Sequence, residues 1–461
     1  MKGYNIILLT IDCLRADHLD CYGYHKKTAP NIARLANRGI LFMDVFSAGP
    51  YTKASFKTIL TGLYPFTKGG YHTIKNVTSL PQMLKKFGYK TFAIPNNVLL
   101  NPKSGYSKGF DIYIDPVKKD VGVQKKIARK LGGGKLINIL DKYIPIMAKK
   151  IRSMFAENPY LTAIDVLRLM IRFIIENRKS RFFIWAHFMD AHHPYRFLPN
   201  TYRMLHGKSI SKRKVNRVNR MLSHYVHFRK NFRVDLLDEV INLYDTQIRF
   251  IDKIIGKLLE LLEQLELMES TIIVITSDHG EEFMEHGAFG HSGIRYVSHL
   301  YQELLWVPLV IWHPNITKKK VETPVSTADI VPTILAANGI HACNLDGENI
   351  LGNAKSAARI LFSEASLYNY RRGIMRIGPG ERIALAVRIR NWKLIYYDDP
   401  HKKPELYNLS KDPKEKENLI DVHRDLAQEI IEHIVKKRIK KIKRDLVQQS
   451  IYERVCKIFN Y

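Results

Sequence analysis

Five short apolar runs, separated by amphipathic stretches, are the feature that most constrains the fold of this chain. The runs cover residues 5–11, 90–95, 181–188, 271–277 and 308–312, and each has the length of a single strand. The stretches at 32–37, 80–87, 240–265 and 330–337 carry apolar residues at three- and four-residue spacing, as helices with one buried face do. This alternation predicts an α/β protein with a mostly parallel sheet flanked by helices.

Three parts are expected along the 461 residues, because a chain of this length exceeds one ordinary core. We expect a large domain at 1–350, a small sheet subdomain at 351–425 and a basic helical tail at 426–461. Strand-like runs at 359–362, 382–387 and 393–397 indicate the subdomain. Two Lys/Arg-rich segments, about 118–180 and 203–233, contain no strand-like run and are interpreted as helical insertions. They either form a helical cap or lie on a membrane surface.

The charge balance favours anionic partners. Lys and Arg number 73 against 44 Asp and Glu, which gives a formal charge of +29. Nucleic acid, anionic lipid and phosphorylated metabolites are all attracted to such a surface, although a solvated basic surface explains the charge equally well. No specific nucleic-acid motif is present, and a hydrophobic content of 46% excludes a disordered or fibrous chain.

The cysteines and the N-terminal segment predict a reducing environment. The four cysteines are scattered and form no Cys-x-x-Cys pair, and no secretory leader precedes the first apolar run. That run is too short to span a bilayer, so we interpret it as a buried strand. We therefore expect a cytoplasmic protein, with a peripheral contact to the inner face of the membrane as a further hypothesis.

Acidic and imidazole side chains follow two of the predicted strands. Asp12 ends the first run, and Asp278, His279 and Gly280 follow the run 271–277. In an open α/β sheet, ligands bind outside the carboxyl ends of the strands, so these groups are expected to converge. A lone aspartate after a strand is usually a helix cap, but Asp-His-Gly-Glu-Glu after a buried run indicates a bound cation.

Histidines gather in two further segments. Asp190, His192 and His193 follow the run 181–188, and His286 and His291 lie in a glycine-punctuated loop. Imidazoles can donate to an oxyanion and transfer protons near neutral pH, as ester cleavage requires. Either loop histidine could be a metal ligand or a general acid. The alternative for the first group is a surface turn stiffened by the following proline.

The ordered set of motifs resembles the sulfatase family of the alkaline phosphatase superfamily over nearly the whole chain. Each motif alone is weak, but seven in the order of the family are specific. The resemblance implies a catalytic α/β domain and a small carboxy-terminal sheet subdomain. In chain order the motifs cover residues 11–18, 22–24 with 29–31, 60–65, 189–192, 277–282, 307–309 and 405–419.

The resemblance locates the nucleophile at Thr52. In sulfatases a Cys or Ser stands ten residues before the Gly of Leu-Thr-Gly and is oxidised to formylglycine, and ten residues before Gly62 stands Thr52. Threonine cannot become formylglycine, and Ala54 and Phe56 replace the expected proline and arginine. Thr52 instead resembles the unmodified threonine of nucleotide pyrophosphatases, phosphoethanolamine transferases and lipoteichoic acid synthases. Beside a divalent cation such a hydroxyl can attack phosphorus.

The same resemblance implies the metal ligands. Asp12, Asp278 and His279 are the expected ligands, and Thr52 completes the set. Cys13 stands where many sulfatases have a second aspartate, which leaves a calcium site one carboxylate poorer. Two carboxylates, one imidazole and one hydroxyl suit manganese, zinc or magnesium at least as well as calcium, so the identity of the divalent metal ion stays open.

Other site residues have roles that the resemblance implies less directly. His192 is the expected substrate-contacting histidine and His291 the expected acid on the leaving-group side, with His286 as its alternative. Lys53 and His193 are candidates for substrate contact. Lys53 and Lys57 either stabilise charge or lie on a solvated helix face.

One metal ion is expected, although Asp190, His193 and His291 could hold a second one.

The predicted function is therefore a metal-dependent, sulfatase-like hydrolase or transferase that cleaves a phosphate or sulfate ester through Thr52. The expected partner is an anionic ester, lipid-linked or saccharide-linked. A sulfuric ester hydrolase that works without formylglycine is one alternative. A non-catalytic protein that binds anionic ligands or a membrane surface is the other.

Overall fold

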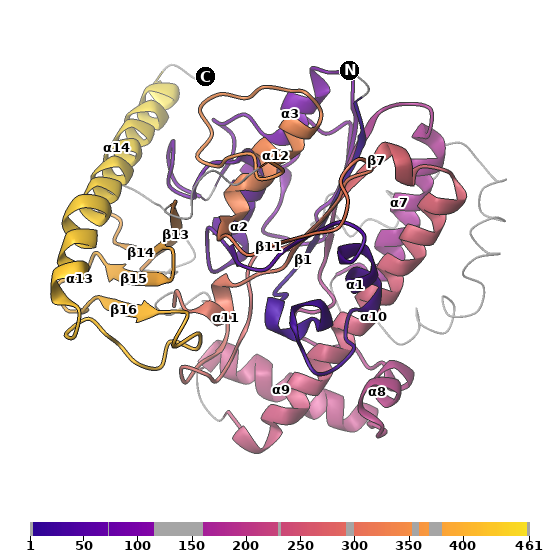
Figure 1. Ribbon diagram of the computed structural model, residues 1–461, viewed down its shortest axis with the longest axis horizontal. Helices are drawn as coiled ribbons and strands as arrows, with labels where there is room; N and C mark the ends of the chain where they lie inside the picture. The colour runs from indigo at the N-terminus through magenta and orange to yellow at the C-terminus, as the bar shows by residue number, and fades with distance from the viewer. Residues whose placement is uncertain are drawn as a thin grey trace.

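A large sheet with helices on both faces forms the centre of the molecule (Figure 1). The computed structural model describes residues 3–71, 73–114, 160–228, 232–291, 299–352, 359–367 and 380–458. The eight strands of this sheet have the order β11-β2-β10-β7-β1-β6-β4-β5. Their bounds are β1 (Asn5–Ile11), β2 (Ile40–Phe42), β4 (Lys90–Ile94), β5 (Ile112–Tyr113), β6 (Phe182–Phe188), β7 (Thr271–Ser277), β10 (Leu309–Trp312) and β11 (Lys319–Val321).

The middle of the sheet is parallel, as predicted. Strand β1 lies between β6 and β7 and pairs in parallel with both, and β4 and β5 continue this direction. Strand β10 runs antiparallel between β7 and β2. All five apolar runs form strands of this sheet. Because β1, β6 and β7 are buried along their whole length, they read as continuous apolar runs and not as alternating ones.

Helices cover both faces of the sheet. On one face α1 (Pro30–Ala36), α7 (Ala163–Asn177) and α10 (Leu237–Gln264) pack their apolar residues on the strands. On the other face lie α2 (Thr52–Thr61), α3 (Leu80–Lys85) and α12 (Ile330–Ala337). The four predicted helices correspond to α1, α3, α10 and α12.

The two basic segments contain helices that pack on the protein. Residues 118–159 of the first segment lie outside the described part, and its remainder forms α7 over the sheet. The second forms the end of α8 (Pro199–His206) and α9 (Lys212–Phe228), which pack on α10. Val215, Val218 and Leu222 of α9 are buried in the same core as the sheet. The apolar side of α9 is therefore already used inside the molecule.

A small antiparallel sheet forms beside the large one, as expected for the C-terminal region (Figure 1). Its strands are β13 (Ile360–Ser366), β14 (Ile383–Ile389), β15 (Trp392–Tyr397) and β16 (Glu405–Asn408). They share a core with α13 (Arg424–Ile430), a π-helical turn (Ile431–Val435) and α14 (Lys436–Ile458). The division into domains at 350 and 425 stays a prediction.

Short strands and one short helix lie between these elements. The strands are β3 (Val45–Phe46), β8 (Glu282–Phe283), β9 (Phe289–Gly290) and β12 (Val325–Ser326), and α11 spans Gln302–Leu305. None of the described helices combines the length and apolar character needed to cross a bilayer.

Helix α14 is tied to the segment that follows α2. The Arg438 guanidinium donates to Glu364 Oε1 (2.6 Å) and to Thr67 Oγ1 (3.0 Å) and stacks on the ring of Tyr64. Further along α14, Asp445 accepts a hydrogen bond from the backbone N–H of Lys68 at 3.1 Å. These contacts hold residues 64–68 from the C-terminal side.

Lys57 holds the same segment from inside. This side chain on α2 is fully buried, and its Nζ donates to the carbonyls of Pro65, Thr67, Gly69 and Gly70 at 2.7 to 3.1 Å. The solvated helix face that we considered for Lys57 is therefore wrong. Its contacts give it a structural role in folding the chain back after α2.

Candidate active site

Asp12 and Asp278 lie side by side at the carboxyl ends of two neighbouring strands. In the parallel pairing of β1 with β7, Ile11 is opposite Ser277, so the residue after each strand lies at the same edge. Both aspartates are fully buried. His279 lies beside them, with its Nε2 3.3 Å from Asp278 Oδ2 and 3.9 Å from Asp12 Oδ1. The structure brings together the three groups that the sequence placed at this edge.

Thr52 is the first residue of α2 and faces the same point. Its side chain is 3% exposed, and its Oγ1 lies 3.4 Å from His279 Nε2. The capping position belongs to Tyr51, so the Thr52 hydroxyl lies inside the first turn of the helix. The first-turn backbone N–H groups, which find no partner within a helix, and the positive end of the helix dipole favour an anion here.

The tautomer of His279 is set by its neighbour. Its Nδ1–H donates to the carbonyl of Gly280 at 2.9 Å, which leaves the lone pair on Nε2. Burial lowers the pKa of His279, so the ring stays neutral. A neutral imidazole with its lone pair between two carboxylates and a hydroxyl is a typical metal ligand.

Cys13 and two residues that sequence reasoning missed, His187 and Asn97, surround Asp12. Its Oδ2 lies 3.1 Å from His187 Nε2 and accepts a hydrogen bond from Asn97 Nδ2 at 3.1 Å. Its Oδ1 accepts from the thiol of Cys13 at 2.8 Å. His187 stands inside the apolar run of β6, and a polar residue within a buried strand was the available signal.

The two aspartates have opposite electrostatic surroundings. Burial and the nearby charge of Asp12 raise the pKa of Asp278 to about 8. Burial also opposes ionisation of Asp12, but the hydrogen bond with His187 and the charges of His192 and His187 hold its pKa well below the ordinary value. Asp278 Oδ2 has no hydrogen-bond partner among the described residues.

The donor set fits a divalent cation. One group of donors that could hold an ion is Asp12, His187 and Asp278, and an overlapping group is Asp12, Cys13 and His279, each within 4.8 Å. Two adjacent buried carboxylates repel each other unless a positive charge lies between them, and an unpartnered buried oxygen is costly. Carboxylate and imidazole donors therefore lie together at this edge, and the ligand set Asp12, Thr52, Asp278 and His279 stays a prediction.

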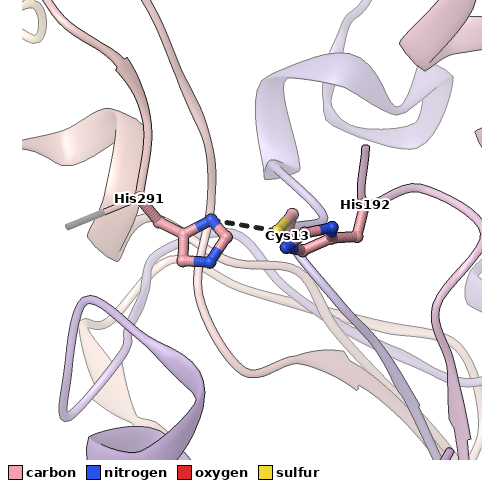
Figure 2. A group of neighbouring side chains, drawn as sticks. All are labelled: Cys13, His192 and His291. Carbon is pink, nitrogen blue, oxygen red and sulfur yellow. Dashed lines mark hydrogen bonds between the residues drawn. The ribbon is translucent and has the colours of Figure 1, made fainter. Parts of the chain in front are cut away.

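A second cluster consists of Cys13, His192 and His291 (Figure 2). Cys13 Sγ lies 3.4 Å from His291 Nδ1, and one donor atom of each residue lies within 4.8 Å of the others. The Nδ1–H of His291 also donates to Glu281 Oε1 at 2.8 Å. Burial, with the charge of Asp12 nearby, raises the pKa of the Cys13 thiol. His192 and His291, which sequence reasoning proposed for substrate and proton transfer, thus lie together beside the carboxylates.

Asp190 and His193, two residues of the considered second metal site, contact other groups of the protein. Asp190 is 2% exposed and lies 3.0 Å from Arg196 Nε, which pairs it with a cation of the protein. The ring of His193 stacks on that of His192 with centroids 4.5 Å apart, and burial lowers its pKa to about 3. The segment is not a surface turn, because Asp190 and Tyr195 are buried.

His286 contacts the C-terminal region. Its ring stacks on Tyr301 at 3.7 Å, its Nε2 is 3.1 Å from the carbonyl of Glu415 and its Nδ1 is 3.4 Å from Glu303 Oε2. Lys53 is half-buried, directly after Thr52, and burial lowers its pKa. The substrate roles of Lys53, His193 and His286 stay predictions.

Comparison of the sequence with known proteins identifies the family of the chain. The family model described as Sulfatase matches residues 4–340, and the model of the N-sulphoglucosamine sulphohydrolase C-terminal region matches residues 285–445. Arylsulfatase A of Homo sapiens is 25% identical over 462 residues, which cover 90% of this chain and 83% of the relative. Arylsulfatase K of Bos taurus is 34% identical over 175 residues, 36% of this chain and 31% of the relative.

Solved structures share the fold over nearly the full length. A phosphonate monoester hydrolase of Agrobacterium radiobacter has a TM-score of 0.71 at 19% identity, with 95% of this chain and 96% of that one covered. A protein solved with D-glucosamine-2-N,6-O-disulfate has a TM-score of 0.70 at 17% identity, with 96% and 99% covered. The family model spans most of the sequence, including both strands that carry the aspartates. The chain therefore belongs to the sulfatase family of ester-hydrolysing enzymes, within the alkaline phosphatase superfamily.

Proposed function

We propose that this enzyme cleaves a phosphorus ester, by hydrolysis or transfer, with the hydroxyl of Thr52 as its nucleophile. The observation that carries the proposal is the position of that hydroxyl. It is buried at the N-terminus of α2, 3.4 Å from His279 Nε2, which itself lies beside Asp12 and Asp278. A phosphoryl group that reaches Thr52 meets the positive end of the helix and these ligands together.

Asp12, Asp278 and His279 would hold a divalent cation, with Thr52 next to it. Such a cation lowers the pKa of a neighbouring hydroxyl and neutralises charge on the ester oxygens. The thiol of Cys13 in place of a second aspartate makes an all-oxygen calcium site a poorer match than manganese, zinc or magnesium.

The residues of the chain divide the chemistry between them. Thr52 Oγ1 forms a bond to phosphorus and loses its proton to solvent, and the bond to the leaving oxygen breaks. His291, whose Nδ1 lies 2.8 Å from Glu281 Oε1, would protonate the leaving alcohol. The phosphothreonine is then cleaved by water, which completes hydrolysis, or by an acceptor alcohol, which completes transfer.

Sulfate ester hydrolysis without formylglycine is the second candidate. The family model and the arylsulfatase relatives favour it, whereas Thr52 and the phosphonate monoester hydrolase fold favour phosphorus. The structure solved with a sulfated glucosamine supports an anionic, saccharide-linked ester as substrate. A lipid-linked ester and a location at the inner membrane face stay predictions. The basic residues Arg213, Arg217 and Arg220 of α9 are exposed, so membrane contact would be electrostatic.

The test is a chromogenic panel of aryl phosphate, aryl phosphodiester, aryl phosphonate and aryl sulfate. Metal-stripped protein is resupplied with manganese, zinc, magnesium or calcium before each assay. We expect metal-dependent release from a phosphorus ester, and a fall in kcat of at least about 10⁴-fold in Thr52→Ala because the nucleophile is removed.

Thr58→Ala is the matched control, since Thr58 is a buried threonine of the same helix. It should keep its activity. Release from the sulfate alone would favour the second candidate, and full activity in Thr52→Ala would exclude Thr52 as nucleophile.

A further inference from the structure

A hollow away from the candidate active site lies between the segment after α2, the start of α3 and the middle of α14. Its volume is about 730 Å³, which is in the range of pockets that hold small molecules. Lys68, Lys75 and Lys108 are its basic lining residues, and none of its described lining residues belongs to the candidate active site. We propose that this hollow binds a sugar that carries phosphate or sulfate groups, at a site separate from the one where the ester is cleaved.

Three ammonium groups from separate positions in the sequence meet at the hollow. Lys68 and Lys75 form no ion pair with another described residue. The Lys108 ammonium donates to the carbonyl of Lys75 at 2.7 Å, and a carbonyl does not cancel its charge. The acidic residue of the described lining, Asp445, already accepts a hydrogen bond from the backbone N–H of Lys68. Like charges around a hollow repel one another and attract anions, so the lining favours an anionic ligand.

The backbone at Lys68 is fixed in an uncommon conformation. Lys68 has a φ of 55°, in the left-handed region that glycine and asparagine usually occupy. The Nζ of Lys57 donates to the carbonyls of Thr67 and Gly69, on either side of it, at 2.7 and 2.9 Å. The backbone N–H of Lys68 donates to Asp445 at 3.1 Å. Strained backbone that its surroundings maintain gathers at binding sites, and here it carries a lysine to the hollow.

The wall that carries Lys75 and Lys108 is fixed as well. The carbonyl of Lys108 accepts a hydrogen bond from the Ser79 hydroxyl at 3.2 Å. The backbone N–H of Ile74 donates to the carbonyl of Ser104 at 2.9 Å, which joins the two chain segments of this wall. Because these contacts exist without a ligand, binding orders little of the backbone and costs less conformational entropy.

Neutral polar groups define the rest of the ligand. The side chains of Asn76, Thr78 and Gln448 line the hollow and make no hydrogen bond to other described residues. Amides and hydroxyls can both donate and accept, as the hydroxyl groups of a sugar require. Val77 is the apolar residue of the described lining and is only 9% exposed, so an acyl chain finds little surface here. A lone phosphate ion would use the lysines but leave most of the volume and the amides without contacts.

Calorimetry on the metal-stripped, full-length chain tests the site without an activity assay. The probes are glucose 6-phosphate and glucose 6-sulfate, with glucose and inorganic phosphate as their separate parts. We expect one equivalent of each sugar ester to bind, at least about tenfold more tightly than either part, because only the ester uses both the ammonium groups and the amides. Tighter binding of the 6-phosphate would assign a phosphorylated sugar, and tighter binding of the 6-sulfate a sulfated one.

Lys68→Gln/Lys75→Gln should weaken this binding by at least about tenfold, because two charged donors are removed from the hollow. Lys253→Gln/Lys318→Gln is the matched control, since it removes the same charge at exposed lysines outside the lining, and it should bind like wild type. Turnover of an aryl ester by the metal-loaded variants should stay within about twofold of wild type, which shows that both are folded.

Three results would overturn the proposal. They are no binding of either sugar ester, unchanged binding in the Lys68→Gln/Lys75→Gln variant or an equal loss in the control, and inorganic phosphate that binds as tightly as glucose 6-phosphate. The binding is measured on metal-stripped protein and does not rest on Thr52 as the nucleophile, so the two proposals fail separately.

Discussion

Buried carboxylates have different partners at the two sheets of this enzyme. At the carboxyl edge of the large sheet, Asp12 and Asp278 are fully buried beside His187, His279 and the thiol of Cys13. Imidazole and thiol groups can release a proton to solvent when they bind a metal, and they carry no fixed positive charge.

Beside the small sheet, the buried glutamates Glu364 and Glu415 each pair with a basic side chain. Glu364 lies 2.6 Å from the Arg438 guanidinium and Glu415 lies 2.7 Å from Lys393 Nζ, and both carboxylates have no exposed side-chain surface. These pairs are complete without a ligand, so their role is structural. A binding site therefore differs from a structural ion pair in the partner of the buried carboxylate, more than in its burial.

Among the variants that test this comparison, Asp278→Asn should show the largest effect on activity. Turnover should fall at least about 10³-fold, because several kcal/mol of charge stabilisation by the metal are lost. The metal-free variant should be at least as stable as metal-free wild type, since a carboxylate with an unpartnered buried oxygen is removed. Steady-state kinetics and denaturant unfolding measure the two effects. Marked destabilisation of the metal-free variant would show that the Asp278 carboxylate has a structural role, as Glu364 has.

Glu364→Gln should show the opposite behaviour. We expect the free energy of unfolding to fall by about 3–5 kcal/mol, because Arg438 keeps a buried charge without its partner. Activity per folded molecule should stay within about twofold, since the pair does not touch the active site. Urea unfolding gives the first value and active-site titration the second. The double variant Glu364→Gln/Arg438→Met should recover part of the loss, and an unchanged stability would show that the pair is dispensable.

Glu281→Gln should have an intermediate effect. Glu281 accepts a hydrogen bond from His291, so without this carboxylate the imidazole proposed to protonate the leaving alcohol loses its support and kcat should fall by up to about 10²-fold. Steady-state kinetics with esters of good and poor leaving groups measure the effect, and the loss should be larger for the poor leaving group. An unchanged kcat for both esters would mean that Glu281 does not support an acid.

His286→Gln should have the smallest effect, and its sign follows from the pKa. Although burial opposes protonation, the hydrogen bond and charge of Glu303 raise the pKa of His286 above 6.5. The protonated ring therefore stabilises the fold below about pH 6.5, and this contribution disappears as the pH rises through the folded-state pKa. We expect a loss of less than about 1 kcal/mol at pH 6 and none at pH 9. Thermal unfolding at both values checks this, and a large fall in kcat would return His286 to the active site.

The site residues at the strand ends could be predicted from the sequence, whereas the residues that surround them could not. Asp12 and Asp278 were identifiable because each directly follows an apolar run, and parallel strands bring such ends together. His187 reaches Asp12 only through the register of β1 with β6, which places it opposite Thr10. Asn97 arrives from the segment after β4. Neither the register nor that segment's path can be read from local spacing.

Other errors came from judging side chains by their type. Lys57 is a lysine on a helix, and such residues are usually solvated, yet four carbonyls of a folded-back segment enclose it. Strand β16 spans only Glu405–Asn408 and has no apolar run of its own, so its pairing with β15 alone makes it a strand. In both cases tertiary contacts outweigh local propensity.

The hydrogen bonds between α14 and residues 64–68 have a consequence for protein synthesis. Thr52 and its helix are translated early, but the Arg438 and Asp445 contacts that hold the segment after this helix come from the last part of the described chain. The ribosome must therefore pass residue 445 before the support of the segment after the proposed nucleophile is in place. We expect nascent chains that stop before residue 436 to be inactive.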